Sequence, residues 1–192
     1  MKLSDLTVDW LKNNHYNAYF FGLGFVQVKI DDQRRVHFYH PDLRAFVDNP
    51  HDHRYNFISK VLRGRLINEI WEEYEPEIPA SITTDIFAKI GYASCQKDGA
   101  DIEVPEPYDA CIDYVGEFSV NEGSSYYISR NSFHKVNPDF SLGPCVTFIT
   151  RGPVQKDFAR VLQLPSYKED CPFSKEIKDD ELWQIVRECL SI

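Results

Sequence analysis

Short apolar segments separated by turn residues run through most of the chain, and this pattern restricts the fold more than any other feature. Turn signals stand at Asp31–Asp32, Gly64 and Asp98–Gly99, residue types that favour a change of chain direction. The segments that we predict as β structure are 18–30, 35–40, the run from the His51–His53 pair toward Leu62, 65–71, 81–95, 110–120, 123–136 and 145–150. Because no helices alternate with these segments, the pattern predicts a mainly β protein, an antiparallel sandwich or barrel.

Helical spacing is confined to the ends of the chain. Residues 4–14 can form a short helix capped by Ser4, and residues 155–162 and 180–190 have apolar side chains at helical intervals. The apolar stripe from Leu182 to Leu190 must be buried either on the outer face of the β core or on a second copy. The second possibility would make the protein a homodimer.

The length of 192 residues suits one well-buried domain. We expect a single domain over residues 1–192, with a β core at 15–152 and helical extensions at 1–14 and 153–192.

A net charge of −9 argues against nucleic acid or an anionic membrane as the main partner. The first ten residues contain no apolar core of a secretory signal, and no apolar run reaches membrane-spanning length. The cysteines are scattered and form no C-x-x-C pair, which indicates reduced thiols. We expect a cytoplasmic location.

Two histidines, His51 and His53, are separated by one residue just before an apolar run. On a strand they would point to the same face with Cβ atoms about 6.5–7 Å apart. Two imidazoles at that spacing can share one metal ion at about 2.0–2.1 Å each. Tyr55 and Phe57 would continue this inward face, while Asp52 would point the other way. The alternative is two unrelated surface histidines beside a loop.

A third histidine, His134, lies in the segment G-S-S-Y-Y-I-S-R-N-S-F-H-K-V-N-P, which begins at Gly123. With the H-x-H pair and the glycine at position 64, this segment resembles the two motifs of the cupin superfamily. The resemblance covers residues 45–140 and implies a small antiparallel β-barrel, or jelly roll, with one metal ion held by His51, His53 and His134. Ala45 stands where the first motif begins with glycine, and Asn131 replaces a glycine of the second.

Phe57 stands at the motif's acidic position, which leaves three histidines and no carboxylate. This pattern is similar to the thiol dioxygenases, the cupin branch that includes cysteine dioxygenase. That resemblance implies an Fe(II) cofactor that brings a thiolate and dioxygen together. The branch often carries a cysteine where this chain has Ile58, and a histidine and a tyrosine where it has Ile149 and Arg151.

Further side chains are candidates for the same pocket. Arg35, His37 and Tyr39 alternate along one strand and so share a face. The alternative for that face is partial exposure to solvent. The proposed catalytic residues are His37, Tyr39 and Arg151, and the proposed substrate-binding residues are Arg35, Tyr55 and Tyr126.

Three functions remain open from the sequence. The first is a non-haem Fe(II) dioxygenase acting on a small thiol or other anionic metabolite. The second is a metal-assisted sugar or metabolite isomerase or epimerase, for which zinc, nickel or manganese could serve. The third is a non-catalytic module that binds a small ligand.

Overall fold

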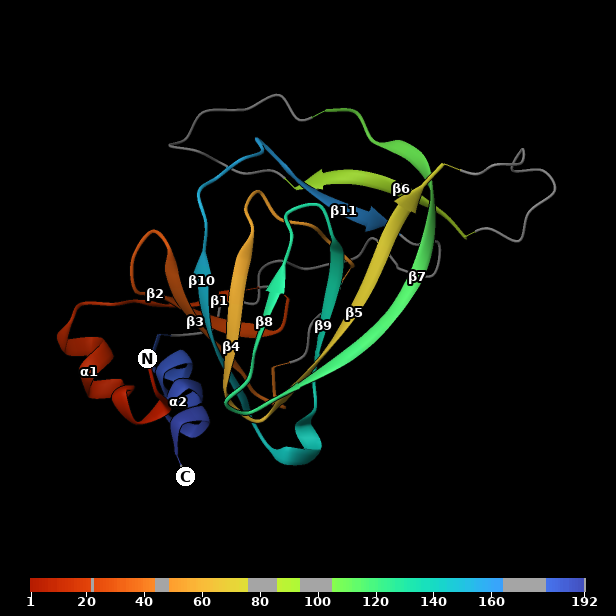
Figure 1. The fold of residues 1–192 in the computed structure, drawn as a ribbon. Helices are drawn as coiled ribbons and strands as arrows, with labels where there is room; N and C mark the ends of the chain where they lie inside the picture. The colour runs from red at the N-terminus through yellow and green to blue at the C-terminus, as the bar shows by residue number, and fades with distance from the viewer. Residues whose placement is uncertain (22, 44–48, 76–85, 94–104, 164–178, 192) are drawn as a thin grey trace.

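The computed structural model describes residues 1–21, 23–43, 49–75, 86–93, 105–163 and 179–191. These residues form two antiparallel sheets with short helices at the two ends of the chain (Figure 1). The first sheet contains, in spatial order, β1 (Ala18–Phe21), β2 (Phe25–Lys29), β3 (Arg34–Tyr39), β10 (Cys145–Arg151), β4 (Phe57–Arg63) and β8 (Ser125–Ile128). The second contains β11 (Ala159–Gln163), β6 (Ile86–Ala93), β7 (Tyr108–Asn121), β5 (Arg65–Tyr74) and β9 (Phe133–Pro138). The predicted fold class, mainly β with short terminal helices, is confirmed.

The inner faces of the two sheets pack against each other. Phe25, Val61 and Cys145 of the first sheet share a buried cluster with Leu66 and Val120 of the second. This packing is the core of a β-sandwich, in which alternate residues of each strand point inward.

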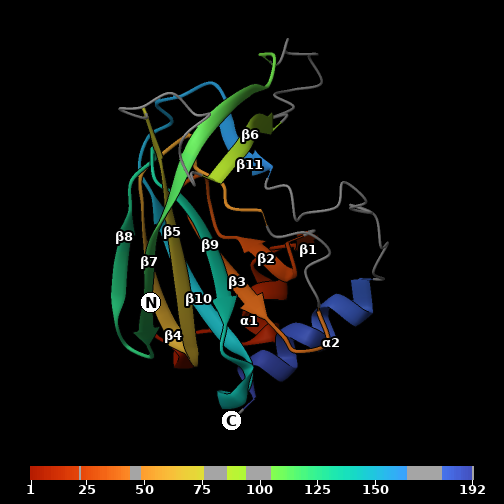
Figure 2. The same ribbon diagram turned by 90° about the vertical axis from the view of Figure 1, so that its right-hand side faces the viewer.

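The two helices, α1 (Val8–Asn13) and α2 (Asp179–Leu190), lie side by side against the outer face of β1–β3 and β10 (Figures 1 and 2). Thr7 caps α1 by accepting a hydrogen bond from the Trp10 N–H at 3.0 Å. The outward residues of β2 and β3, such as Val28 and Val36, pack with Val186 of α2. Those strands are therefore buried on both faces, and the stripe on α2 is buried within its own chain.

The chain passes from β4 of the first sheet to β5 of the second at Gly64, whose φ of +76° lies in the left-handed region. A Cβ there would meet the backbone oxygen of Pro144 at 2.9 Å. Both the backbone conformation and the close approach therefore require glycine at this position.

Several expected elements differ in the structure. Residues 159–163 form the strand β11 and not the predicted helix, because they pair with β6, with Leu162 opposite Ile90. The prediction of a helical extension over 153–192 is therefore wrong for residues 159–163. The cap of the first helix is Thr7 and not Ser4, since Leu3–Asp5 forms a separate 3-10 turn.

The segments 18–30 and 123–136 each contain two strands where one was expected. The positive φ of Gly24 (+86°) goes with the turn between β1 and β2. The break between β8 and β9 is a turn at 129–132, where the N–H of Ser132 donates to the oxygen of Ser129 at 3.1 Å. The parts of the predicted strand 81–95 at 81–85 and 94–95, and the Asp98–Gly99 turn, lie outside the described residues. None of the described helices is both long enough and apolar enough to cross a lipid bilayer.

Candidate metal centre

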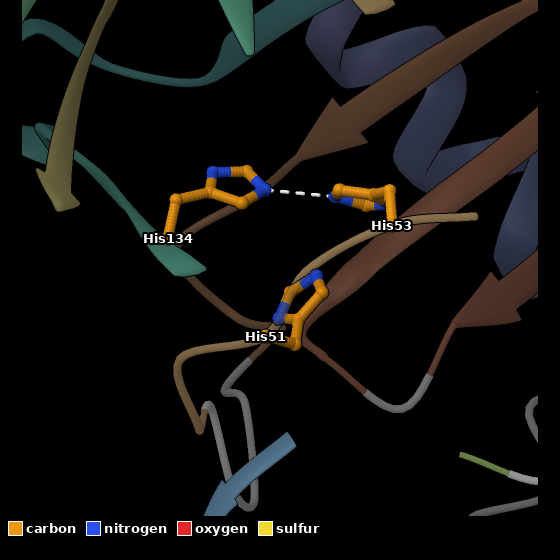
Figure 3. A group of neighbouring side chains, drawn as sticks. All are labelled: His51, His53 and His134. Carbon is orange, nitrogen blue, oxygen red and sulfur yellow. Dashed lines mark hydrogen bonds between the residues drawn. The ribbon is translucent and has the colours of Figure 1, made fainter. Parts of the chain in front are cut away.

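The side chains of His51, His53 and His134 converge on one point (Figure 3). Each offers one ring nitrogen, and the three nitrogens lie within 4.8 Å of one another. The ring centroids are 5.0 Å apart for His51 and His53, 5.2 Å for His51 and His134, and 5.0 Å for His53 and His134. The three rings thus form a nearly equilateral triangle, the arrangement that one shared ion requires.

Two of the three nitrogens, those of His53 and His134, have a spacing close to that of two ligands of one metal ion. Nε2 of His53 is 2.8 Å from Nε2 of His134. Two nitrogens that bind an ion at about 2.1 Å and at right angles would be about 3.0 Å apart. Nδ1 of His51 lies 3.1 Å from the backbone oxygen of Asn49. Because a carbonyl oxygen only accepts, this nitrogen carries the proton and leaves Nε2 free to bind an ion.

The three imidazoles are held in the neutral form that metal binding requires. Burial lowers the pKa of His51, although the hydrogen bond to Asn49 opposes this. Burial, followed by the neighbouring His51, lowers the pKa of His134 well below its usual value. The pKa of His53 is also well below its usual value, through burial and then through His51 and His134. Neutral imidazoles bind a cation without first losing a proton.

Phe57 closes one side of the triangle. Its ring lies 4.8 Å from that of His53 and 5.7 Å from that of His134, and it is buried. No carboxylate joins the three histidines within the described part of the chain. An ion held here would keep its full charge for ligands on its open side.

The backbone that carries His51 lies between the edge strands of the second sheet. His51 forms bridges with His134 of β9 and with Val161 of β11. The N–H of His51 donates to the oxygen of His134 at 3.0 Å, and the N–H of His134 donates back at 3.0 Å. The expectation that the H-x-H pair belongs to the strand before Leu62 is wrong, because β4 begins only at Phe57.

His37 and Tyr39 are buried, so the alternative of a partly solvated face is wrong for these two residues. His37 Nε2 lies 3.2 Å from Oε1 of Gln27, and the Tyr39 hydroxyl lies 3.4 Å from His37 Nδ1. Because the Gln27 oxygen only accepts, His37 donates from Nε2 and accepts from the tyrosine at Nδ1. Burial lowers the pKa of His37 well below its usual value. The structure thus places a neutral His–Tyr pair on this inward face.

Two guanidinium groups lie over the ring of Tyr55. Cζ of Arg35 is 5.6 Å and Cζ of Arg151 4.9 Å from the ring centroid, and that ring is 5.6 Å from His53. The side chain of Arg35 donates to Gln27, and that of Arg151 to the backbone oxygen of Asp32. Among the described residues neither arginine forms an ion pair. Burial, together with the neighbouring Arg151, lowers the pKa of Arg35.

Tyr126 lies behind Phe57, with ring centroids 6.4 Å apart, and burial raises the pKa of its hydroxyl to about 12. It packs against Phe57, which lies between it and the histidines, so its predicted role in binding substrate stays a prediction.

The sequence analysis missed the partners of one residue beside the site. Asp52 points away from the rings, as strand alternation predicts, but its carboxylate is fully buried between Lys156 and Arg160. Those cations lie more than 100 residues further along the chain, so no local pattern could have revealed the contact.

Comparisons with known proteins leave the family unassigned. No protein-family model matches the sequence, and no curated protein matches it. Solved structures with some similarity include the Drosophila melanogaster CENP-C cupin domain, with 8% identity and a TM-score of 0.38 over 71% of this chain and 75% of that chain. They also include hydroxypropylphosphonic acid epoxidase from S. wedmorenis, with 13% identity and a TM-score of 0.37 over 67% of this chain and 51% of that chain.

A third is hydroquinone 1,2-dioxygenase from Sphingomonas sp. TTNP3, with 7% identity and a TM-score of 0.34 over 65% of this chain and 63% of that chain. At these identities and TM-scores the likenesses carry no functional assignment. What the structure itself shows is a mainly β protein with three converging histidines.

Proposed function

We propose that the chain is a mononuclear metalloenzyme whose ion is held by His51, His53 and His134, and that it is an Fe(II)-dependent dioxygenase. The observation that supports this proposal is the set of three imidazole nitrogens within 4.8 Å, with no carboxylate in the group. Imidazole suits iron, zinc, copper and nickel. An Fe(II) ion with only three protein ligands would supply open positions for dioxygen and for a substrate atom.

The substrate that fits the surroundings is a small anion, and a thiol-bearing carboxylate meets this requirement. Arg35 and Arg151 present two guanidinium groups close to the histidines, and neither is neutralised by a described carboxylate. Guanidinium groups bind carboxylate and phosphate oxygens through paired N–H donors. In this proposal the His37–Tyr39 pair holds a proton beside the substrate, and Phe57 excludes water from the site.

The test is the metal content of the purified protein beside that of His53→Ala. We expect about one ion per chain in the wild type and its loss in the variant, because two remaining nitrogens hold an ion poorly. His15→Asn is the matched control. His15 has a positive φ of +59° and lies outside the cluster, and asparagine tolerates that conformation.

The identity of the ion and the uptake of oxygen separate the candidate functions. Bound iron with substrate-dependent oxygen uptake supports the dioxygenase. Stoichiometric zinc, nickel or manganese without oxygen uptake would point to an isomerase or epimerase instead. A folded protein that takes up no metal under any loading condition would exclude the metalloenzyme and leave a ligand-binding module.

A further inference from the structure

The H-x-H segment is held in place from its outer side by the last strand of the sheet. The N–H of Asp52 donates to the backbone oxygen of Arg160 at 3.0 Å, and the N–H of Leu162 donates to that of Pro50 at 2.8 Å. Residues 50–52 are thus paired with β11 on one side and with His134 of β9 on the other. The position of two of the three histidines depends on a strand from the far end of the chain.

The side chain of Asp52 fixes the same contact. Its carboxylate accepts from Lys156 Nζ at 2.6 Å, from the backbone N–H of Arg160 at 2.7 Å and from Arg160 Nε at 2.8 Å. Asp52 is fully buried, whereas both cations are about one-fifth exposed. A carboxylate that is buried in this way stays ionised at low cost only while these donors are present.

Arg160 connects the two parts of the metal centre. One nitrogen of its guanidinium group binds Asp52, and another binds Glu73 of β5 at 2.8 Å. The face of the group lies over the ring of Phe133, with Cζ 4.6 Å from the centroid. Phe133 immediately precedes His134, so Arg160 contacts the neighbours of all three histidines.

We infer that Asp52, held by hydrogen bonds from Lys156 and Arg160, is the positioning residue of the metal centre. The strand β11, which carries Arg160, is therefore part of the site. Asp52 lies between His51 and His53 in the sequence, and its side chain points away from their rings. It binds no ion and touches no substrate in this assignment. Its role is to fix the direction of the backbone from which the two imidazoles project, and this role rests on the proposed metal site.

The test compares Asp52→Asn with Asp139→Asn. The control removes the charge from a similar pair, in which Asp139 accepts from Arg65 Nε at 2.9 Å. Asp139 lies beyond the end of β9 and contacts none of the three histidines through any described hydrogen bond. Two readouts are needed: the imidazole ¹⁵N NMR signals of the metal-free protein, and the Kd for Fe(II) or Co(II).

We expect Asp52→Asn to shift the imidazole signals of His51 and His53 and to raise the metal Kd by about 10–100-fold, as loss of a residue that orients ligands does. Asp139→Asn should change neither. A folded Asp52→Asn protein with unchanged imidazole signals and a Kd within twofold of the wild type would overturn the inference. If the wild type binds no metal, the proposed function fails, but the NMR signals still decide the role of Asp52.

If Asp52→Asn does not fold, Lys156→Met and Lys156→Arg decide the question. The methionine variant should shift the same signals and weaken metal binding several-fold, and the arginine variant should restore both, because it keeps a donor for the carboxylate. Identical signals and affinities in the two variants and the wild type would overturn the inference.

Discussion

At the scale of single residues, the histidine triangle has an apolar neighbour on one side and cationic neighbours on another. Phe57 closes one side with an apolar ring, and the guanidinium groups of Arg35 and Arg151 lie beyond Tyr55. Burial, and to a smaller extent repulsion from the neighbouring Arg151, lowers the pKa of Arg35. An anion bound between them would relieve this repulsion.

The anion proposal predicts that Arg35→Met and Arg151→Met each raise the KM for an anionic substrate by about 10–100-fold, the loss expected for a hydrogen bond to a charged group. The measurement is oxygen uptake with 3-mercaptopropionate beside the uncharged 2-mercaptoethanol. Arg34→Met is the control, because Arg34 is exposed and paired with Asp31. A preference for the carboxylate that survives both substitutions would contradict the proposed roles.

At the scale of elements, the strands around the site are aligned by turns that accept only certain residues. Gly64 joins β4, which follows the H-x-H segment, to β5, which pairs with β9 beside His134. Its left-handed φ and the Pro144 carbonyl oxygen, 2.9 Å from where a Cβ would stand, leave room only for glycine at this crossing between the sheets. Gly123 has a similar φ but open space where a Cβ would stand.

Gly64→Ala should lower the free energy of unfolding by about 2–4 kcal/mol, since it adds a steric clash to the cost of a left-handed alanine. Gly123→Ala should cost only about 1–2 kcal/mol, the conformational part alone. Denaturant titrations of both variants measure the difference. Equal losses would mean that the chain around Pro144 moves aside without cost.

At the scale of the whole molecule, α2 completes the structure by covering the outer face of the first sheet. Its buried side chains include Cys189, whose Sγ lies 3.6 Å from the backbone oxygen of Tyr39. Cys145 of β10 is buried in the core between the sheets. The stripe on α2 is covered within the chain and thus gives no reason for a dimer, which stays a prediction that light scattering can check.

The two cysteines offer a test of whether the chain unfolds as one domain. Burial raises the pKa of each thiol to about 12, so each stays protonated and unreactive in the native protein. If the chain unfolds as one domain, both thiols become accessible only on global unfolding. Mass mapping after alkylation should then show equal, slow labelling of Cys145 and Cys189. Much faster labelling of Cys189 would show that α2 detaches on its own.

The raised pKa values of Cys145 and Cys189 also predict that the free energy of unfolding depends on pH. An unfolded thiol has a pKa of about 8.5. The folded state therefore retains protons that the unfolded state loses between about pH 8.5 and pH 12. The contribution of these thiols to stability is fully present below pH 8.5 and declines as the pH rises through that range.

The sequence by itself determined the features that depend on neighbouring residues. Alternating apolar residues indicated the strands, and the H-x-H pair with His134 indicated the three nitrogens that the structure brings together. It also placed Asp52 on the side opposite the rings. The directions of His51, Asp52 and His53 follow from the local geometry of an extended chain. His134 was joined to the pair by the resemblance of its segment to the second cupin motif.

Only the tertiary structure decided the features that depend on distant pairing. Residues 155–162 have helical spacing, but pairing with β6 makes a strand of 159–163. Arg160, 108 residues from Asp52, then holds the histidine segment in place. A local pattern cannot reveal such a contact, because the free energy that overrides helical spacing comes from backbone hydrogen bonds and charges that meet only in the folded chain.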